Sequence, residues 1–183
     1  QLPNADFSLT DNYELADDIR PLTESSLLKN TAWYPVRAPI LYTMTSRGCP
    51  HRCLYCNNSC YVRLHGSNPM RYRSVSHVIA ELEEILSLQG GYHWVFLGDD
   101  DFLVRPEREL EEFSRLYRER IGLPLSICAS ANTFRTDKLE YVLEAGLKII
   151  QLGVQSGSQR VLDEVFHRRV SVCLLYTSPS PRD

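Results

Sequence analysis

The chain has 183 residues, a length that is typical of one domain with its own hydrophobic core. Its formal charge of -3 gives no overall positive field, so nucleic acid and anionic membranes are not expected partners. We find no apolar run as long as a membrane span and no signal peptide pattern, and we expect a protein of the reducing cytosol. In that compartment six cysteines indicate metal or redox chemistry rather than disulfides.

The two ends of the chain differ from its middle. Residues 1–37 show little hydrophobic periodicity, and we interpret them as a lead-in or linker that follows a missing N-terminal domain. Residues 38–172 form the expected core, which we interpret as truncated. The string at 173–183 matches a translated transposon adapter from sequencing libraries, so we expect a non-native tail without helical or strand period. A genuine Ser/Pro-rich linker is the alternative.

Strand and helix patterns alternate through the expected core. Apolar strands that alternate with amphipathic helices predict parallel strands joined by right-handed crossovers, in a sheet that is covered on both faces or curled into a barrel. Four such units do not close a barrel, so we expect a partial parallel (β/α) barrel. The expected elements are a strand at 40–45, a helix from 75 that stops before Gly90, a strand at 94–97, a helix from Pro106 to near Gly122, a strand at 125–129, a helix at 136–146, a strand at 149–154 and a helix from Ser158.

Three cysteines lie close together after the first expected strand. Cys49, Cys53 and Cys56 have the spacing C-x3-C-x2-C. Thiolates are soft, electron-rich ligands that suit iron in a cluster, and three of them on a four-iron cube leave one iron open. Gly48 and Pro50 allow the backbone to wrap closely around such a cube. The motif therefore favours a 4Fe–4S cluster without a fourth protein ligand.

Other metal sites could use the same cysteines. Cys60 lies four residues after Cys56, so four thiolates could form a zinc site in a structural or interaction module. A closed electron-transfer cluster would take His51 or Cys60 as its fourth ligand. The position of these cysteines at the head of a βα series makes both alternatives weaker than the open cluster. Cys128 reads most simply as a buried strand residue.

The cysteine spacing, with the aromatic Tyr55 before the last cysteine, resembles the signature of the radical S-adenosylmethionine (SAM) superfamily. The resemblance covers about residues 38–171 and implies a barrel of the radical SAM type. It also implies that Cys49, Cys53 and Cys56 hold a 4Fe–4S cluster, and that Tyr55 belongs to the cofactor site. The open iron would bind the amino and carboxylate groups of SAM. One electron would then cleave the sulfonium and release a 5′-deoxyadenosyl radical.

An acidic turn follows the second expected strand. Many superfamily members have a Gly-Gly-Glu segment here, whereas the sequence around Asp99 and Asp100 resembles the Asp-Asp-x-Phe variant of the cobalamin-associated subgroup. The resemblance implies that this pair meets the amino group of the cofactor. The alternative is a solvated acidic turn that caps the helix from Pro106.

A Gly/Ser turn follows the fourth expected strand. Residues 153–158 resemble the Gly-Ile-Glu-Ser-Gly-Ser segment that contacts the ribose and methionine carboxylate of SAM, with Gln155 in place of the commoner glutamate. We therefore expect Gly153, Gln155 and Ser156 in the cofactor site, and Asn132 as a weaker candidate for the same pocket. Because ligand sites gather at the carboxyl ends of parallel strands, these turns and the cysteine loop are expected to share one pocket.

The function that we expect is reductive cleavage of SAM to start radical chemistry on an unknown small organic substrate. The electron would come from a donor such as flavodoxin or ferredoxin. Residues 2–8 resemble the segment after a cobalamin-binding domain, so cobalamin is expected only in a longer protein. A methylthiotransferase-type enzyme acting on RNA or protein is the alternative enzyme. We expect residues 1–183 alone not to turn over substrate.

Overall fold

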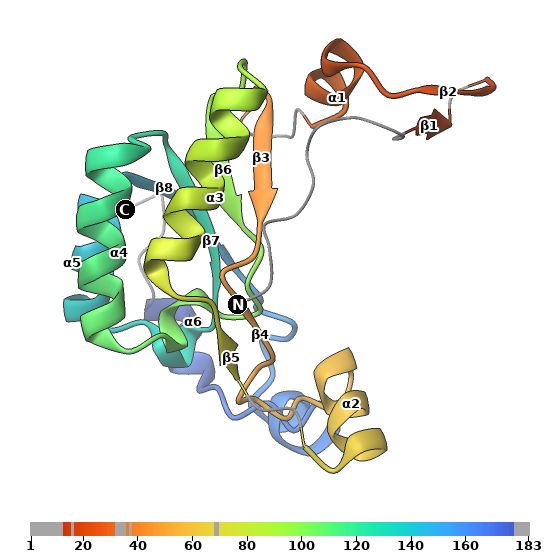
Figure 1. Cartoon of the computed structure of the whole chain (residues 1–183). Helices are drawn as coiled ribbons and strands as arrows, with labels where there is room; N and C mark the ends of the chain where they lie inside the picture. Colours follow the sequence, from red (N-terminus) through yellow and green to blue (C-terminus); the bar gives the residue numbers. More distant parts are fainter. Residues whose placement is uncertain (1–12, 16, 32–35, 37, 68–69, 178–183) are drawn as a thin grey trace.

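The computed structural model describes residues 13–15, 17–31, 36, 38–67 and 70–177 (Figure 1). The lead-in resemblance at 2–8 and the chain end at 178–183 lie outside these residues. The centre of the molecule is a four-stranded sheet in the order β3, β6, β7, β8, with every pair parallel. This confirms the expected partial (β/α) barrel. The strands are β3 (Ile40–Thr43), β6 (Trp94–Leu97), β7 (Leu125–Ala129) and β8 (Leu147–Leu152).

Three helices connect these strands and lie on one side of the sheet (Figure 1). They are α3 (Val75–Leu88), α4 (Glu107–Arg120) and α5 (Thr136–Glu144). Ser74 caps α3, because its hydroxyl oxygen accepts a hydrogen bond from the His77 backbone N–H at 3.4 Å. Helix α4 has glutamates in its first turn and arginines in its last turn, which favours the helix dipole. We call the sheet and these three helices the body.

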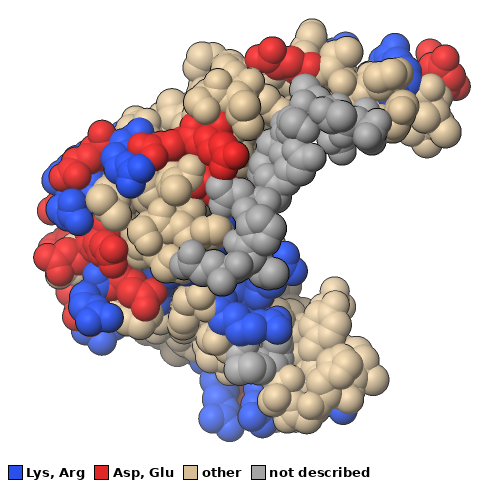
Figure 2. Space-filling model, viewed as in Figure 1, with Lys and Arg blue, Asp and Glu red and all other residues tan. Residues whose placement is uncertain are grey.

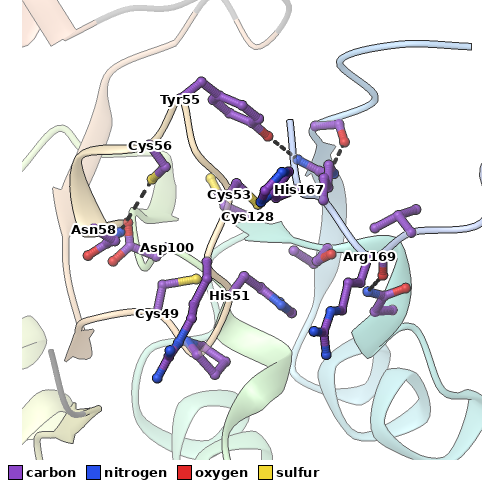
Figure 3. A pocket seen from close by; sticks show the side chains of 18 of the residues that line it. Cys49, His51, Cys53, Tyr55, Cys56, Asn58, Asp100, Cys128, His167 and Arg169 are labelled. Atoms are coloured by element: carbon purple, nitrogen blue, oxygen red, sulfur yellow. Dashed lines mark hydrogen bonds between the residues drawn. The ribbon is translucent and has the colours of Figure 1, made fainter. Parts of the chain in front are cut away.

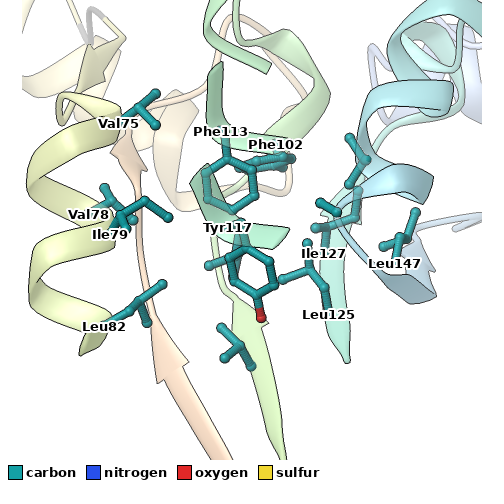
Figure 4. Close-up of a cluster of buried hydrophobic side chains, with 14 of the residues drawn as sticks. Val75, Val78, Ile79, Leu82, Phe102, Phe113, Tyr117, Leu125, Ile127 and Leu147 are labelled. Carbon is teal, nitrogen blue, oxygen red and sulfur yellow. The ribbon is translucent and has the colours of Figure 1, made fainter. Parts of the chain in front are cut away.

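The hydrophobic core lies between the sheet and the three helices (Figure 4). Phe113 of α4 is 1% exposed, and its ring centroid lies 5.2 Å from that of Phe102 and 5.3 Å from that of Tyr117. Aromatic pairs at this spacing add stability beyond the area that they bury. Leu82 of α3 and Leu125 of β7 are fully buried in the same cluster. The core therefore lies mainly within the body and fixes the sheet whose edge carries the candidate site.

Several boundaries differ from the expected ones. The first strand ends at Thr43, because the chain then turns into a second, antiparallel pair of β4 (Ser46–Arg47) with β5 (Arg71–Tyr72). Helix α2 (Asn57–His65), between the two, was not expected. Strand β8 begins at Leu147, two residues early. Instead of a regular helix from Ser158, the structure has a single π-helical turn, η3 (Val161–Val165). Short 3-10 turns also follow β6 and β7, at η1 (Phe102–Val104) and η2 (Ala131–Thr133).

The N-terminal segment forms a hairpin and a helix at one end of the molecule. Strands β1 (Tyr13–Leu15) and β2 (Ile19–Pro21) pair antiparallel and extend away from the body, and α1 (Glu24–Thr31) follows (Figure 1). Leu28 of α1 packs against the core. None of the helices in the described ranges is both long and apolar enough to cross a membrane.

The expectation that the tail lacks secondary structure was wrong for its first residues. Helix α6 (Val172–Thr177) covers them, and Leu174 and Leu175 are half-buried. The Leu175 N–H donates to the Ser171 carbonyl oxygen at 3.2 Å. The reason is that residues 172–176 are mostly apolar, so they gain by covering η2 even without a clear sequence period.

Candidate cluster and cofactor site

A cavity of about 1200 Å³ opens at the carboxyl ends of the parallel strands. This is the edge at which parallel α/β proteins gather ligand sites, and the volume suits a cofactor with its substrate. The loops after all four strands contribute to its wall, as does the segment after η3. Its lining includes Cys49, His51, Arg52, Cys53, Tyr55, Cys56, Asn58, Asp100, Cys128, Asn132, Gly153, Asp163, His167, Arg168 and Arg169.

The cysteine loop joins β4 to α2 and carries the three expected ligands. Figure 3 shows the sulfur atoms of Cys49, Cys53 and Cys56 facing the same space. Gly48 enters the loop at a φ of 93°, a conformation that a larger residue adopts only with strain. Cys56 is the N-cap of α2 and has an extended backbone. The structure therefore brings the three cysteines to one side of the cavity.

Burial keeps one of these thiols protonated in the free protein. The pKa of Cys49 is raised to about 11, chiefly by desolvation. A hydrogen bond from the His51 backbone opposes this rise, and the nearby Asp100 and Asp101 carboxylates and Cys56 add to it. A metal must displace this proton, because the thiolate is the ligand. Metal binding at Cys49 would therefore release the proton of its thiol.

Asp99 does not line the cavity, although the acidic turn was expected to present it with Asp100. Its side chain is buried, and its carboxylate accepts hydrogen bonds from the Thr45 N–H at 2.5 Å, the Ser46 N–H at 3.0 Å and the Thr45 hydroxyl. Asp99 and Asp101 are both buried, whereas Asp100, at the bend between them, lines the cavity. Asp99 fixes the start of the cysteine loop.

Arg105 completes this support from the side of α4. It is 1% exposed, and its guanidinium donates to the Thr45 carbonyl oxygen at 2.8 Å and to the Thr45 hydroxyl oxygen at 2.9 Å. The same group forms an ion pair with Glu109 at 2.6 Å and lies 4.9 Å from the Tyr72 ring centroid of β5. A buried charge needs such partners. Thr45 is therefore held from both sides, by Asp99 and by Arg105.

Asp101 links the cysteine loop to the turn after β7. Its buried carboxylate accepts from the Thr133 hydroxyl at 2.9 and 3.1 Å and lies 3.1 Å from His51 Nε2. His51 lines the cavity between Cys49 and Cys53. The carboxylate orients the imidazole at the cavity wall. From the sequence we expected His51 only as a possible fourth ligand of a closed cluster.

Arg168 forms the opposite side of the site. It is 9% exposed, and its two terminal nitrogens donate to the Tyr55 hydroxyl at 2.6 Å and to the Gly153 carbonyl oxygen at 2.5 Å. Its Nε has no hydrogen-bond partner in the described part of the chain. The Tyr55 ring also packs edge-on against Phe166, with centroids 5.1 Å apart. Arg168 thus ties the cysteine loop to the end of β8 and offers a buried cation to the cavity. No local sequence pattern marked it.

The remaining predicted residues fall into two groups. Asn132 and Gly153 line the cavity, as do Asp100 and Tyr55. Gln155 and Ser156 lie beside it without contributing to its wall. A Cβ on Gly153 would come within 3.0 Å of the Gln155 side-chain nitrogen, so the Gln155 amide folds back over the glycine. Whether these residues contact a cofactor stays a prediction.

The positions of Cys60 and Cys128 in the structure do not match the roles expected for them from the sequence. Cys60 lies on α2 and is absent from the cavity wall where the other three cysteines meet. Cys128 is half-buried and does line the cavity, with its Sγ 3.5 Å from Gln151 Oε1. Within the described ranges, no three His, Cys, Asp or Glu side chains converge on a point that would hold a single metal ion. A four-iron cluster is larger than a single metal ion, so it can bind three thiolates that share a cavity without meeting at one point.

Comparison with known proteins decides the family. The profile of the radical SAM superfamily matches residues 43–172, which include the cysteine loop and strands β6, β7 and β8 but only the last residue of β3. This chain belongs to the radical SAM superfamily. It is 29% identical over 143 residues to an uncharacterised methyltransferase of Pyrococcus horikoshii, covering 78% of this chain and 30% of the relative. It is 26% identical over 146 residues to the cytidylyl-2-hydroxyethylphosphonate methyltransferase of Streptomyces wedmorensis, covering 76% and 25%.

Solved structures share the fold of this radical SAM chain. The methyltransferase TsrM from Kitasatospora setae, solved with cobalamin and a 4Fe–4S cluster bound, superposes with a TM-score of 0.54 at 20% identity over 69% of this chain and 24% of TsrM. Methylornithine synthase (PylB) superposes with a TM-score of 0.55 at 19% identity, over 74% and 38%. The chain thus spans less than two fifths of each of these four proteins.

Proposed function

We propose that this chain holds a 4Fe–4S cluster on Cys49, Cys53 and Cys56 and binds SAM in the adjoining cavity. The observation that carries the proposal is that the three closely spaced cysteines of one loop share a cavity with an acidic and a basic side chain, Asp100 and Arg168. Cys128, which also lines this cavity, lies apart from them in sequence on β7. A cluster bound in this way supplies the electron that cleaves the sulfonium of SAM. The three thiolates suit the cluster. The Arg168 Nε, which has no hydrogen-bond partner among the described residues, suits an oxygen of SAM.

The two charged side chains suit the two charged ends of a bound amino acid. Asp100 is exposed at the cavity wall and can accept from the amino group of SAM. Arg168 can donate from its free Nε to the carboxylate, since a guanidinium is a strong partner for oxyanions. Asn132 and Gly153 lie between them for the remaining polar contacts. These residues would hold SAM in the cavity that the cysteines also line.

We further propose that the whole protein is a methyltransferase that acts on a small organic molecule. Support comes from the two curated relatives, both named as methyltransferases. The fold shared with the cobalamin-bound TsrM favours cobalamin as a second cofactor of the whole protein. Methylthiotransferase chemistry and a zinc module are the less favoured functions, since neither explains the relatives.

Anaerobic reconstitution of this chain with iron and sulfide tests the proposal. We expect about four iron atoms per chain and little zinc, and a reduced cluster whose electron paramagnetic resonance spectrum changes when SAM is added. Cys53→Ala should abolish iron binding, while Cys60→Ala, four residues beyond the last ligand, should leave it intact. Loss of iron in Cys60→Ala, or stoichiometric zinc in the unsubstituted protein, would contradict the open-cluster site.

A further inference from the structure

The side chain of Asn58 turns back toward one of the three expected cluster ligands. Its amide nitrogen lies 3.7 Å from the Cys56 sulfur and donates a hydrogen bond to it (Figure 3). Asn58 is half-buried and lines the cavity, whereas the neighbouring Asn57 of α2 is exposed and does not line it. An asparagine that caps a helix usually stands at the N-cap, and here that position belongs to Cys56. The Asn58 amide is therefore directed at the sulfur.

The other two cysteines of the loop have a donor at the same spacing of two residues. The His51 backbone N–H donates to the Cys49 sulfur. The Tyr55 hydroxyl forms a side-chain hydrogen bond with Cys53, while its oxygen accepts from Arg168. Donors aimed at an ionised acceptor form stronger hydrogen bonds than neutral pairs do. The folded loop thus offers one donor to each sulfur that would become a thiolate ligand.

The charge of the surrounding chain favours negative charge on these sulfurs as well. The sequence has no Asp or Glu between Glu24 and Glu81. Figure 2 shows blue side chains and no red over the segment from β4 to β5 on the face drawn. The carboxylates that act on Cys49, those of Asp100 and Asp101, come from the turn after β6. An added negative charge on the ligands is therefore opposed from the side of β6 and stabilised from within the loop.

From these contacts we infer that the Asn58 amide raises the reduction potential of the cluster by donating to the Cys56 sulfur. The inference rests on the proposed function, since it needs a redox group on the cysteines. Reduction brings in one electron from a reductant such as dithionite, and the ligand sulfurs share the added negative charge. A hydrogen bond to such a sulfur stabilises the reduced state more than the oxidised state. No covalent bond is made or broken, and no proton moves.

A redox titration of the reconstituted chain, followed by electron paramagnetic resonance without SAM, tests the role of Asn58. Asn58→Leu removes the donor from a side chain of similar size, and Asn57→Leu is the matched control on the exposed neighbour. We expect the equilibrium constant for reduction to fall about tenfold in Asn58→Leu, which for one electron is a shift of about 59 mV to more negative potential. Asn57→Leu should change the constant by less than about twofold.

A second pair of variants separates the hydrogen bond from charge. Asn58→Asp and Asn57→Asp each add one carboxylate to the first turn of α2, where the helix dipole favours it. The charge change is equal, but only the first variant removes an N–H donor from Cys56. We therefore expect a more negative potential in Asn58→Asp than in Asn57→Asp. Circular dichroism and the iron content of each variant show that the comparison is made between folded, loaded chains.

The same samples distinguish this inference from the proposed function. A parent chain that binds no iron would contradict the cluster site and the role of Asn58 together. A parent chain that holds the cluster and responds to SAM, with equal potentials in the Asn58 and Asn57 variants, would overturn the role of Asn58 alone. A more positive potential in Asn58→Leu would also overturn it. So would loss of iron from both Asn58 variants while the Asn57 variants stay loaded, because Asn58 would then serve cluster uptake.

Discussion

The body differs in its stabilisation from the segment that carries the cysteine loop. We call this segment, residues 44–67 and 70–73 with β4, α2 and β5, the cluster-loop lobe. The body buries Leu82 and Phe113 completely and pairs the arginines of α4 with glutamates. Helix α2 of the lobe buries a single residue, Ser59, and Leu64 is 69% exposed. The lobe is instead held at its edges, by Asp99 beneath Thr45 and by Arg168 against Tyr55. The body can therefore fold by its own packing, while the order of the lobe depends on contacts from outside it.

The largest difference should appear when equivalent apolar groups are removed from the two regions. Phe113→Ala should lower the free energy of unfolding by about 3–5 kcal/mol, because it leaves a cavity between Phe102 and Tyr117. Leu64→Ala on α2 should change it by less than about 0.5 kcal/mol. Urea denaturation of the metal-free chain measures both. A loss from Leu64→Ala as large as that from Phe113→Ala would remove the distinction between body and lobe.

The next effect concerns the contact that joins the two regions. Asp99→Asn should lower the free energy of unfolding by about 2 kcal/mol. The substitution puts an amide NH2 donor in place of a carboxylate oxygen in a group that accepts hydrogen bonds from Thr45 and Ser46. It should also reduce iron loading, since the cysteine loop loses its fixed start. Asp100→Asn is the matched control: it should preserve stability and loading but weaken SAM binding, measured by calorimetry. Equal iron loading in the two variants would show that Asp99 does not position the loop.

The smallest effect tests how well the body excludes water. Burial raises the pKa of Tyr117, whose hydroxyl donates to the Leu123 carbonyl oxygen at 3.0 Å. Above pH 10 the unfolded state loses this proton while the folded state keeps it, so stability falls as pH rises. Tyr117→Phe should cost about 1 kcal/mol at pH 8, and this deficit should shrink above pH 10. Tyr61→Phe on α2 is the exposed control. A deficit that is constant from pH 8 to 11 would contradict the buried phenol.

The body could be predicted from local sequence, because each of its elements has its own apolar pattern. The strands at 94–97 and 125–129 have the expected bounds, and helix α3 starts at the expected residue. Strand β8 starts early because it pairs with β7 across an irregularity at Leu125 and Ser126, which is a long-range effect. The pair of β4 with β5 joins segments about 25 residues apart, and so short a ladder has no detectable period.

The site was predicted to the extent that its residues lie next to a strand or a motif. Cys49, Cys53 and Cys56 meet at one cavity as the spacing implied. In the acidic turn the sequence did not distinguish the two carboxylates. Only the folded chain shows that Asp99 binds Thr45 and Ser46 while Asp100 lines the cavity. Arg168 follows a π-helical turn, and only the folded chain places it beside Tyr55.

The contact between Arg168 and Tyr55 spans 113 residues of sequence. On a ribosome that adds roughly 5–20 residues per second, Tyr55 precedes its partner by about 6–23 s. During that interval the cysteine loop has left the ribosome, while the wall formed by residues 166–170 has not been made. The cysteine loop is therefore made well before the contact that ties it to the end of β8 can form.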